Sequence, residues 1–167
     1  MSDNDGASVG PISEATVLEA CGKRELPALG VVEQRWETDP IPAAAVERAA
    51  ADAVEALALD DVPDGGEVAV GVGSRGIANL PRIVRGVVAD LDARGYDPFV
   101  FPAMGSHGGA TADGQRAKLD ALGVSESSVG CEIRATMSVT EIGRTPEHGL
   151  AVVADANAAA ADAIVPI

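Results

Sequence analysis

The stretch EVAVGVGSRG, residues 67–76, decides the fold of this chain. Its first half is a short apolar run after the turn formed by Gly65 and Gly66, which is typical of a buried strand. Its second half, residues 71–76, is a literal G-x-G-x-x-G, so the strand runs directly into a glycine-rich loop. The elements expected on either side indicate what this loop does.

Strands and helices alternate downstream of this stretch. Residues 79–95 carry apolar side chains at helical spacing, with Pro81 in the first turn and Gly95 at the end. A strand is expected over 97–104, and it leads into a second glycine-rich loop, GSHGGAT, at 105–111. The runs expected after this loop are a helix from Thr111 to Gly123, strand-like segments in CEIRATM, TEIGRT and LAVVADA, a small helix over 156–162 and a strand over 163–167.

Upstream, the sequence predicts a strand over 28–36, then a break at two prolines and a helix over 43–61. Residues 1–26 show no convincing periodicity and are expected to form a loose lead-in. The alternation predicts an α/β fold over 27–167, with a mostly parallel sheet and flanking helices.

The composition excludes some classes of partner. Twenty-six acidic residues against twelve basic ones give a formal charge of −14, whereas binding to nucleic acid requires clustered Lys and Arg. An acidic chain with few lysines and many alanines is also typical of adaptation to high salt. The polar N-terminus and the lack of a long apolar run predict a soluble, cytoplasmic protein with no membrane partner, in which Cys21 and Cys131 are reduced thiols.

The glycine motif meets only part of the requirement for a dinucleotide site. A Rossmann fingerprint opens a helix directly and is followed about 20 residues later by an acid for the ribose. Here residues 77–81 separate the motif from the helix, and the second strand carries no acid. Arg75 gives the loop another interpretation, because a guanidinium can hold a carboxylate or phosphate by two parallel hydrogen bonds; a structural ion pair is the alternative.

The second loop carries His107 between Ser106 and two glycines. An imidazole titrates near neutrality and can act as a general acid or base, although a structural loop histidine is the alternative. His148 lies in TPEHGL, which indicates a plain hairpin-like turn. Both glycine loops follow strands, and ligands of α/β sheets bind at that edge, so Arg75 and His107 are expected to face one crevice.

Three segments, VGVGSRGI, PAMGSHGGAT and LDALG, together resemble the N-terminal domain of the lactate racemase family, the 2-hydroxyacid racemases and epimerases that depend on a nickel-pincer nucleotide. The resemblance covers about residues 27–167 and is most specific at the histidine loop, which matches the family's G-[ST]-H segment. It implies a Rossmann-like domain and racemisation by reversible hydride transfer to the cofactor. It implies His107 as the proton acid/base and a site for substrate or cofactor built from Arg75, Ser74, Gly73, Ser106, Gly108 and Thr111.

The sequence departs from the family in three places. Val72 replaces an Asp that is common three residues before the arginine, and GSHGG replaces a bulkier, basic continuation. The chain also stops before the segment whose lysine carries the cofactor and before a nickel-ligating histidine. The resemblance therefore predicts an N-terminal part that is inactive alone, with a second chain as a possible partner. A non-catalytic nucleotide- or anion-binding domain and an inactive remnant are the alternatives.

Overall fold

The computed structural model describes residues 13–22, 30–35 and 39–167, and the chain divides into two units, Met1–Asp39 and Pro40–Ile167. The first unit contains helix α1 (Glu14–Ala20), whose N-terminus is capped by the side chain of Ser13, within the segment expected to be a loose lead-in. The strand expected over 28–36 does not form over 30–35, where Val31 and Val32 are exposed; the remainder of it, with Trp36, lies outside the described residues.

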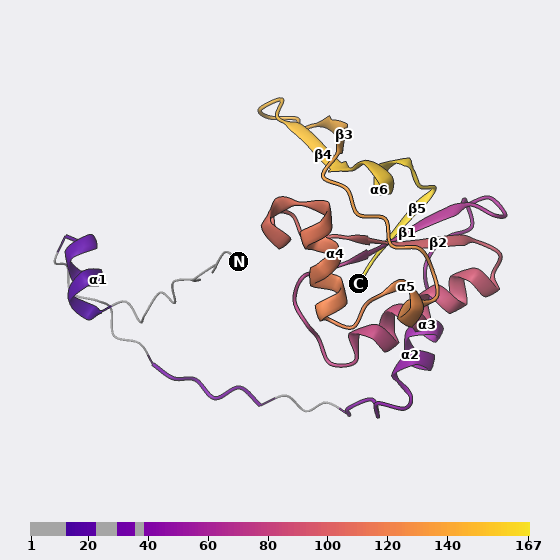
Figure 1. The fold of residues 1–167 in the computed structure, drawn as a ribbon, viewed down its shortest axis with the longest axis horizontal. Helices are drawn as coiled ribbons and strands as arrows, with labels where there is room; N and C mark the ends of the chain where they lie inside the picture. The colour runs from indigo at the N-terminus through magenta and orange to yellow at the C-terminus, as the bar shows by residue number, and fades with distance from the viewer. Residues whose placement is uncertain (1–12, 23–29, 36–38) are drawn as a thin grey trace, which may run out of the picture. The chain divides into compact units, whose positions relative to one another are not determined.

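The second unit is an α/β domain built on a three-stranded parallel sheet in the order β2-β1-β5 (Figure 1). Strand β1 (Glu67–Val72) lies in the middle, with β2 (Asp97–Pro102) on one side and β5 (Ala163–Pro166) on the other. The prediction of an α/β fold with a parallel sheet is confirmed. The expected strand in CEIRATM contributes only a single parallel bridge, between Ile133 and Val100 of β2.

Four helices contribute to the larger core on one face of the sheet, and α2 reaches it by packing on α3 (Figure 1). They are α2 (Val46–Val54), α3 (Leu80–Ala93), α4 (Ala112–Ala121) and α5 (Glu126–Val129). Alternate residues of β1 point into this core, which α3 completes with a stripe that includes Val84, Val88 and Leu91. Helix α2 is shorter than the predicted 43–61, and α5 was not predicted.

The opposite face of the sheet is covered more thinly. Ala69, Phe99 and Phe101 form a small core with Ala158 of helix α6 (Ala156–Ala160). Phe101 explains the first glycine of the sequence motif, because a Cβ on Gly71 would lie 3.1 Å from atoms of its ring. Gly71 is therefore a packing position beneath an aromatic ring.

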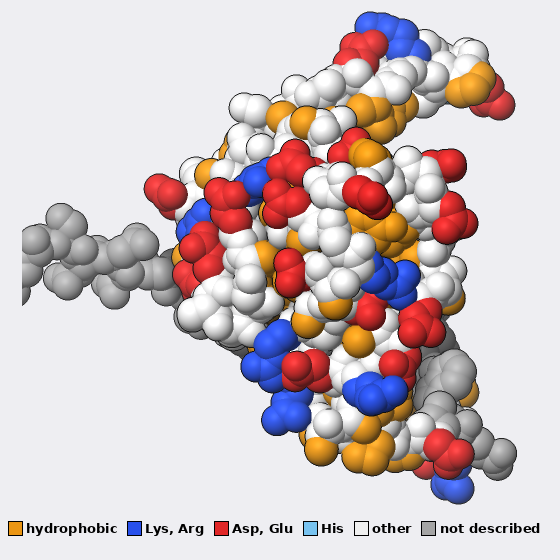
Figure 2. Space-filling model, turned by 90° about the vertical axis from the view of Figure 1, so that its right-hand side faces the viewer, with side chains coloured by type: hydrophobic (Ala, Val, Ile, Leu, Met, Phe, Trp, Pro, Cys, Tyr) orange, Lys and Arg blue, Asp and Glu red, His pale blue; other side chains and the backbone are white. Residues whose placement is uncertain are grey.

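Strands β3 (Val139–Arg144) and β4 (Ala151–Asp155) pair antiparallel and form a hairpin separate from the parallel sheet. The sequence predicted both strands, and His148 lies in the turn between them. Figure 2 shows this hairpin projecting at the top, with hydrophobic side chains at its surface. Val139 and Ile142 are about 61% and 60% exposed, so the hairpin adds little to the core.

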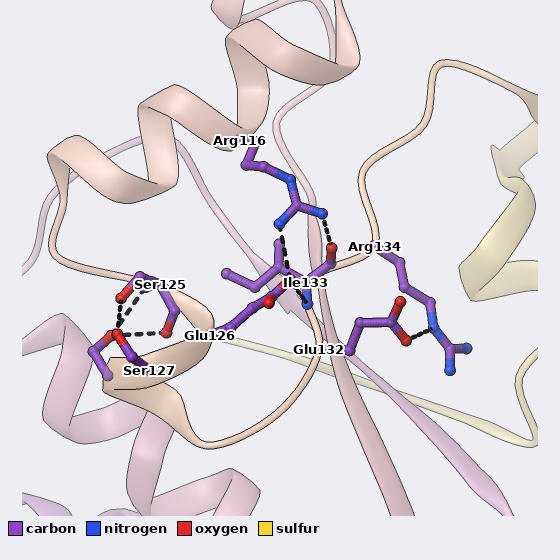
Figure 3. A network of polar contacts seen from close by, with 8 residues as sticks. Arg116, Ser125, Glu126, Ser127, Glu132, Ile133 and Arg134 are labelled. Atoms are coloured by element: carbon purple, nitrogen blue, oxygen red, sulfur yellow. Dashed lines mark hydrogen bonds and ion pairs between the residues drawn. The ribbon is translucent and has the colours of Figure 1, made fainter.

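Arg116 ties helix α4 to the segment that passes β2. Its guanidinium donates to a carboxylate oxygen of Glu126 at 2.9 Å and to the carbonyl of Ile133, while Glu126 also accepts from the Ile133 amide (Figure 3). These hydrogen bonds lower the pKa of Glu126, with the Arg116 contact as the largest cause. They fix α4 relative to the edge of the sheet.

Candidate functional site

A cavity of about 450 Å³ lies at the carboxyl ends of the three parallel strands. Strand β1 lies between β2 and β5, and open α/β sheets bind ligands at the carboxyl ends of their strands. The cavity is lined by Gly73, Ser74 and Arg75 after β1, Ala103, Met104 and His107 after β2, Ile167 after β5, and Ile77 and Leu80 before and in α3.

The two glycine loops meet through one hydrogen bond. Ser74 Oγ and His107 Nδ1 are 2.6 Å apart, although the two residues are 33 positions apart in the sequence. Arg75 and His107 consequently line the same cavity, as the parallel neighbouring strands predict. With Nδ1 engaged by Ser74, the second ring nitrogen of His107, Nε2, is available to a ligand.

A second cavity of about 400 Å³ adjoins the same pair of residues. Its lining consists of Ser74, Arg75, His107, Gly108 and Lys118, the last from helix α4. Neither cavity is lined by an acidic side chain, although the chain has 26 of them. The electrostatic character of the site is therefore opposite to that of the molecule as a whole.

Among the lysines and arginines that the structure describes, Arg75 and Lys118 differ from the others in having no ion-pair or hydrogen-bond partner for the side chain. Over residues 13–22, 30–35 and 39–167, every other arginine forms an ion pair or, for Arg82, donates to the carbonyl of Ala43. No ion pair or hydrogen bond is found for the side chains of Arg75 and Lys118 within this same part of the chain. A structural ion pair therefore does not account for Arg75 there.

The G-x-G-x-x-G motif does not adopt the backbone conformation of a tight phosphate-binding turn. None of Gly71, Gly73 and Gly76 has a positive φ. Gly71 packs beneath Phe101, and a Cβ on Gly73 would meet nothing within 4 Å. Helix α3 begins only at Leu80, after Asn79 in the left-handed region, as the intervening residues predicted.

The histidine loop depends much more on its glycines. Gly108 and Gly109 both have positive φ, and a Cβ on Gly108 would lie 2.5 Å from the backbone of residues 114 and 115. The loop thus packs directly on the first turn of α4. This contact fixes the loop that places His107 in the lining of both cavities.

Two residues expected at the site have local structural contacts. Thr111 Oγ1 accepts from the Gly114 amide as the N-cap of α4 and donates to the Gly108 carbonyl. Ser106 lines neither cavity, and its carbonyl accepts a hydrogen bond from the Ala110 amide. Both residues shape the loop that carries His107.

Sequence reasoning missed Lys118 and the apolar wall of the larger cavity, formed by Ile77, Leu80, Met104 and Ile167. Lys118 lies four residues after Gly114 and therefore on the same face of α4, but only the structure shows that this face packs on the histidine loop. The positions of Leu80 and Ile167 depend on how the strands assemble, and no local pattern reveals them.

Comparison with known proteins does not assign the chain to a family. No family model matches it, and no curated protein and no solved structure matches it. The residues of the site are therefore interpreted from their own geometry and chemistry.

Two further properties concern cofactors and membranes. Within the described residues, no group of three or more His, Cys, Asp or Glu side chains is arranged to hold a metal ion. None of the helices in the described part of the chain combines the length and apolar character needed to cross a membrane.

Proposed function

We propose that the chain binds a small 2-hydroxyacid at the carboxyl ends of its parallel strands, with His107 as the acid/base at the substrate hydroxyl. The observation that supports this most directly is the position of Arg75 and Lys118, whose side chains have no partner among the described residues, beside His107 in cavities lined by no acidic residue of that part of the chain. The sequence resemblance adds the reaction class: the N-terminal, Rossmann-like part of a lactate-racemase-like racemase or epimerase.

Each side chain has a definite role in this proposal. Arg75 holds the carboxylate through two parallel hydrogen bonds, and the apolar wall accommodates the carbon chain of the acid. In this role Nδ1 of His107 carries a proton and donates it to Ser74 Oγ, 2.6 Å away, which leaves Nε2 to take the hydroxyl proton and later return it. Ser74 is thus a positioning residue, and His107 is the catalytic residue.

The nickel-pincer nucleotide that the resemblance implies is not matched by the residues present. The site offers a single imidazole, and the described residues contain no metal-binding cluster. We therefore assign only binding and proton movement to this chain and derive no step through the cofactor.

Calorimetric titration of the full chain with 2-hydroxybutyrate and with butyrate tests the proposal. We expect a Kd of about millimolar for the hydroxyacid, in keeping with one ion pair and a few hydrogen bonds, and weaker binding of butyrate, which lacks the hydroxyl. Arg75→Gln should weaken both ligands, whereas His107→Phe should remove the difference between them. Arg48→Gln removes the same charge from exposed α2, outside both cavities, and is the control.

The alternative, a non-catalytic nucleotide- or anion-binding domain, gives a different pattern. NAD or AMP would then bind more tightly than the hydroxyacid, and the hydroxyl would make no difference to affinity. That result would overturn the hydroxyacid proposal.

A further inference from the structure

We infer that Lys118 forms a second anion subsite, so that the preferred ligand is a 2-hydroxyacid with a second negatively charged group. This inference rests on the proposed function, since it concerns the same site. It follows from the placement of Lys118, from the absence of competing carboxylates in the cavity lining and from the way α4 is held.

Lys118 projects from the face of α4 that packs on the histidine loop. Gly114, four residues earlier, is in backbone contact with Gly108, and the buried Gln115, three residues earlier, donates to the Gly105 carbonyl at 2.7 Å. Positions three and four residues apart share one face of a helix, so Lys118 follows these two contacts toward the site. Its presence in the cavity lining with Arg75 and His107 agrees with this.

The ammonium group of Lys118 has no partner among the residues that the structure describes. Its position in the last turn of α4 complements the helix dipole, but no carboxylate or carbonyl among the described residues accepts a hydrogen bond from it. Arg116, on the same helix, shows the contrast, because its guanidinium donates hydrogen bonds to Glu126 and to the carbonyl of Ile133 (Figure 3).

A ligand bound at Arg75 and His107 can extend into either of the two cavities. Arg75 and His107 line both of them, and the apolar residues are confined to the larger one, whereas Lys118 lines only the smaller one. A monocarboxylate anchored at Arg75 leaves Lys118 without a partner. A second carboxylate or a phosphate directed along the smaller cavity would meet it.

Malate and 2-hydroxybutyrate form a matched pair for the test, because both have four carbons and a 2-hydroxyl and they differ in the second carboxylate. Titration of the full chain at low ionic strength should give binding of malate about two- to fivefold tighter, the range expected for an exposed ion pair. Lys118→Gln should remove this preference, Lys118→Arg should retain it, and Arg48→Gln should leave it unchanged. The preference should also shrink as salt is added.

The possible results separate this inference from the proposed function. Equal affinities for the two acids, or a preference that survives Lys118→Gln, would overturn the subsite while leaving the proposed function in place. Binding of neither acid, or binding insensitive to Arg75→Gln, would overturn both. A thermal unfolding curve unchanged from that of the parent chain establishes that each exposed substitution leaves the fold intact.

Discussion

Ser74 Oγ lies 2.6 Å from Nδ1 of His107, and this contact joins the loops that follow two neighbouring parallel strands. It engages one nitrogen of the ring and leaves the other available to a ligand. Because His107 is exposed, the hydrogen bond with the half-buried Ser74 supplies an orientation that packing around the ring does not provide.

Replacing Ser74 tests this role. Ser74→Ala should weaken binding of 2-hydroxybutyrate about two- to tenfold, the equivalent of one hydrogen bond, whereas Ser74→Thr retains a hydroxyl and should preserve most of the affinity. The ¹⁵N chemical shift of His107 Nδ1 should change in the alanine variant and not in the threonine variant. Unchanged shifts and affinity in Ser74→Ala would contradict the assignment.

The two glycines after His107 provide a matched pair. Both have positive φ, so Gly109→Ala should cost about 1–2 kcal/mol for the left-handed backbone alone. Gly108→Ala adds a clash with the backbone of residues 114 and 115. It should lower the free energy of unfolding by about 1–3 kcal/mol more than Gly109→Ala does. Urea unfolding measures both values, and equal costs would show that the loop does not pack on α4 as described.

The two cysteines should differ sharply in reactivity. Burial raises the pKa of Cys131 to about 11, so only about one thiol in a thousand is ionised at pH 8, whereas Cys21 is exposed. We expect a thiol reagent to modify Cys21 first in the native chain and both residues in urea. Mass spectrometry of the Cys21→Ser variant isolates Cys131; rapid labelling of that variant under native conditions would contradict the burial.

Stability should fall in acid partly because of Glu126. The hydrogen bonds from Arg116 and the Ile133 amide lower its pKa in the folded state. The unfolded chain therefore takes up this proton more readily than the folded chain. The contribution of Glu126 to the free energy of unfolding is complete above about pH 4.3, the ordinary pKa of Glu, and it is lost as the pH falls through the lower pKa of the folded state. Glu126→Gln should flatten the acid limb of urea stability measured against pH, while Glu55→Gln, in an exposed position outside this network, should not.

The sequence was informative where the structure depends on local pattern. The helix at 80–93 follows from its apolar stripe, Pro81 and Gly95, and the strands at 67–72 and 97–102 follow from short apolar runs. The loops carrying Arg75 and His107 could be placed together because both follow parallel strands. The helix and the two strands rest on short-range spacing, and the placement of the loops rests on the rule that parallel strands end at the same edge of a sheet.

Other features depended on tertiary context. The runs at 139–144 and 151–155 have the composition of strands, but whether they join the parallel sheet or pair with each other is decided by the connection between them. Val31 and Val32 favour a strand by propensity, yet 30–35 finds no neighbouring strand to pair with in the part of the chain that is described. The position of Lys118 at the site could be recognised only after the structure showed which face of α4 packs on the histidine loop.

The placement of β5 beside β1 has a consequence for how the domain forms. The amide of Glu67 at the start of β1 bonds to Asp162, 95 residues away, just before β5. Strand β1 can therefore pair with β5 only when the long segment between them is brought into a closed loop. Pairing between strands so distant in sequence slows folding. On the ribosome, β1 and β2 can pair early, while one edge of β1 has to wait until almost the whole of this chain has been synthesised.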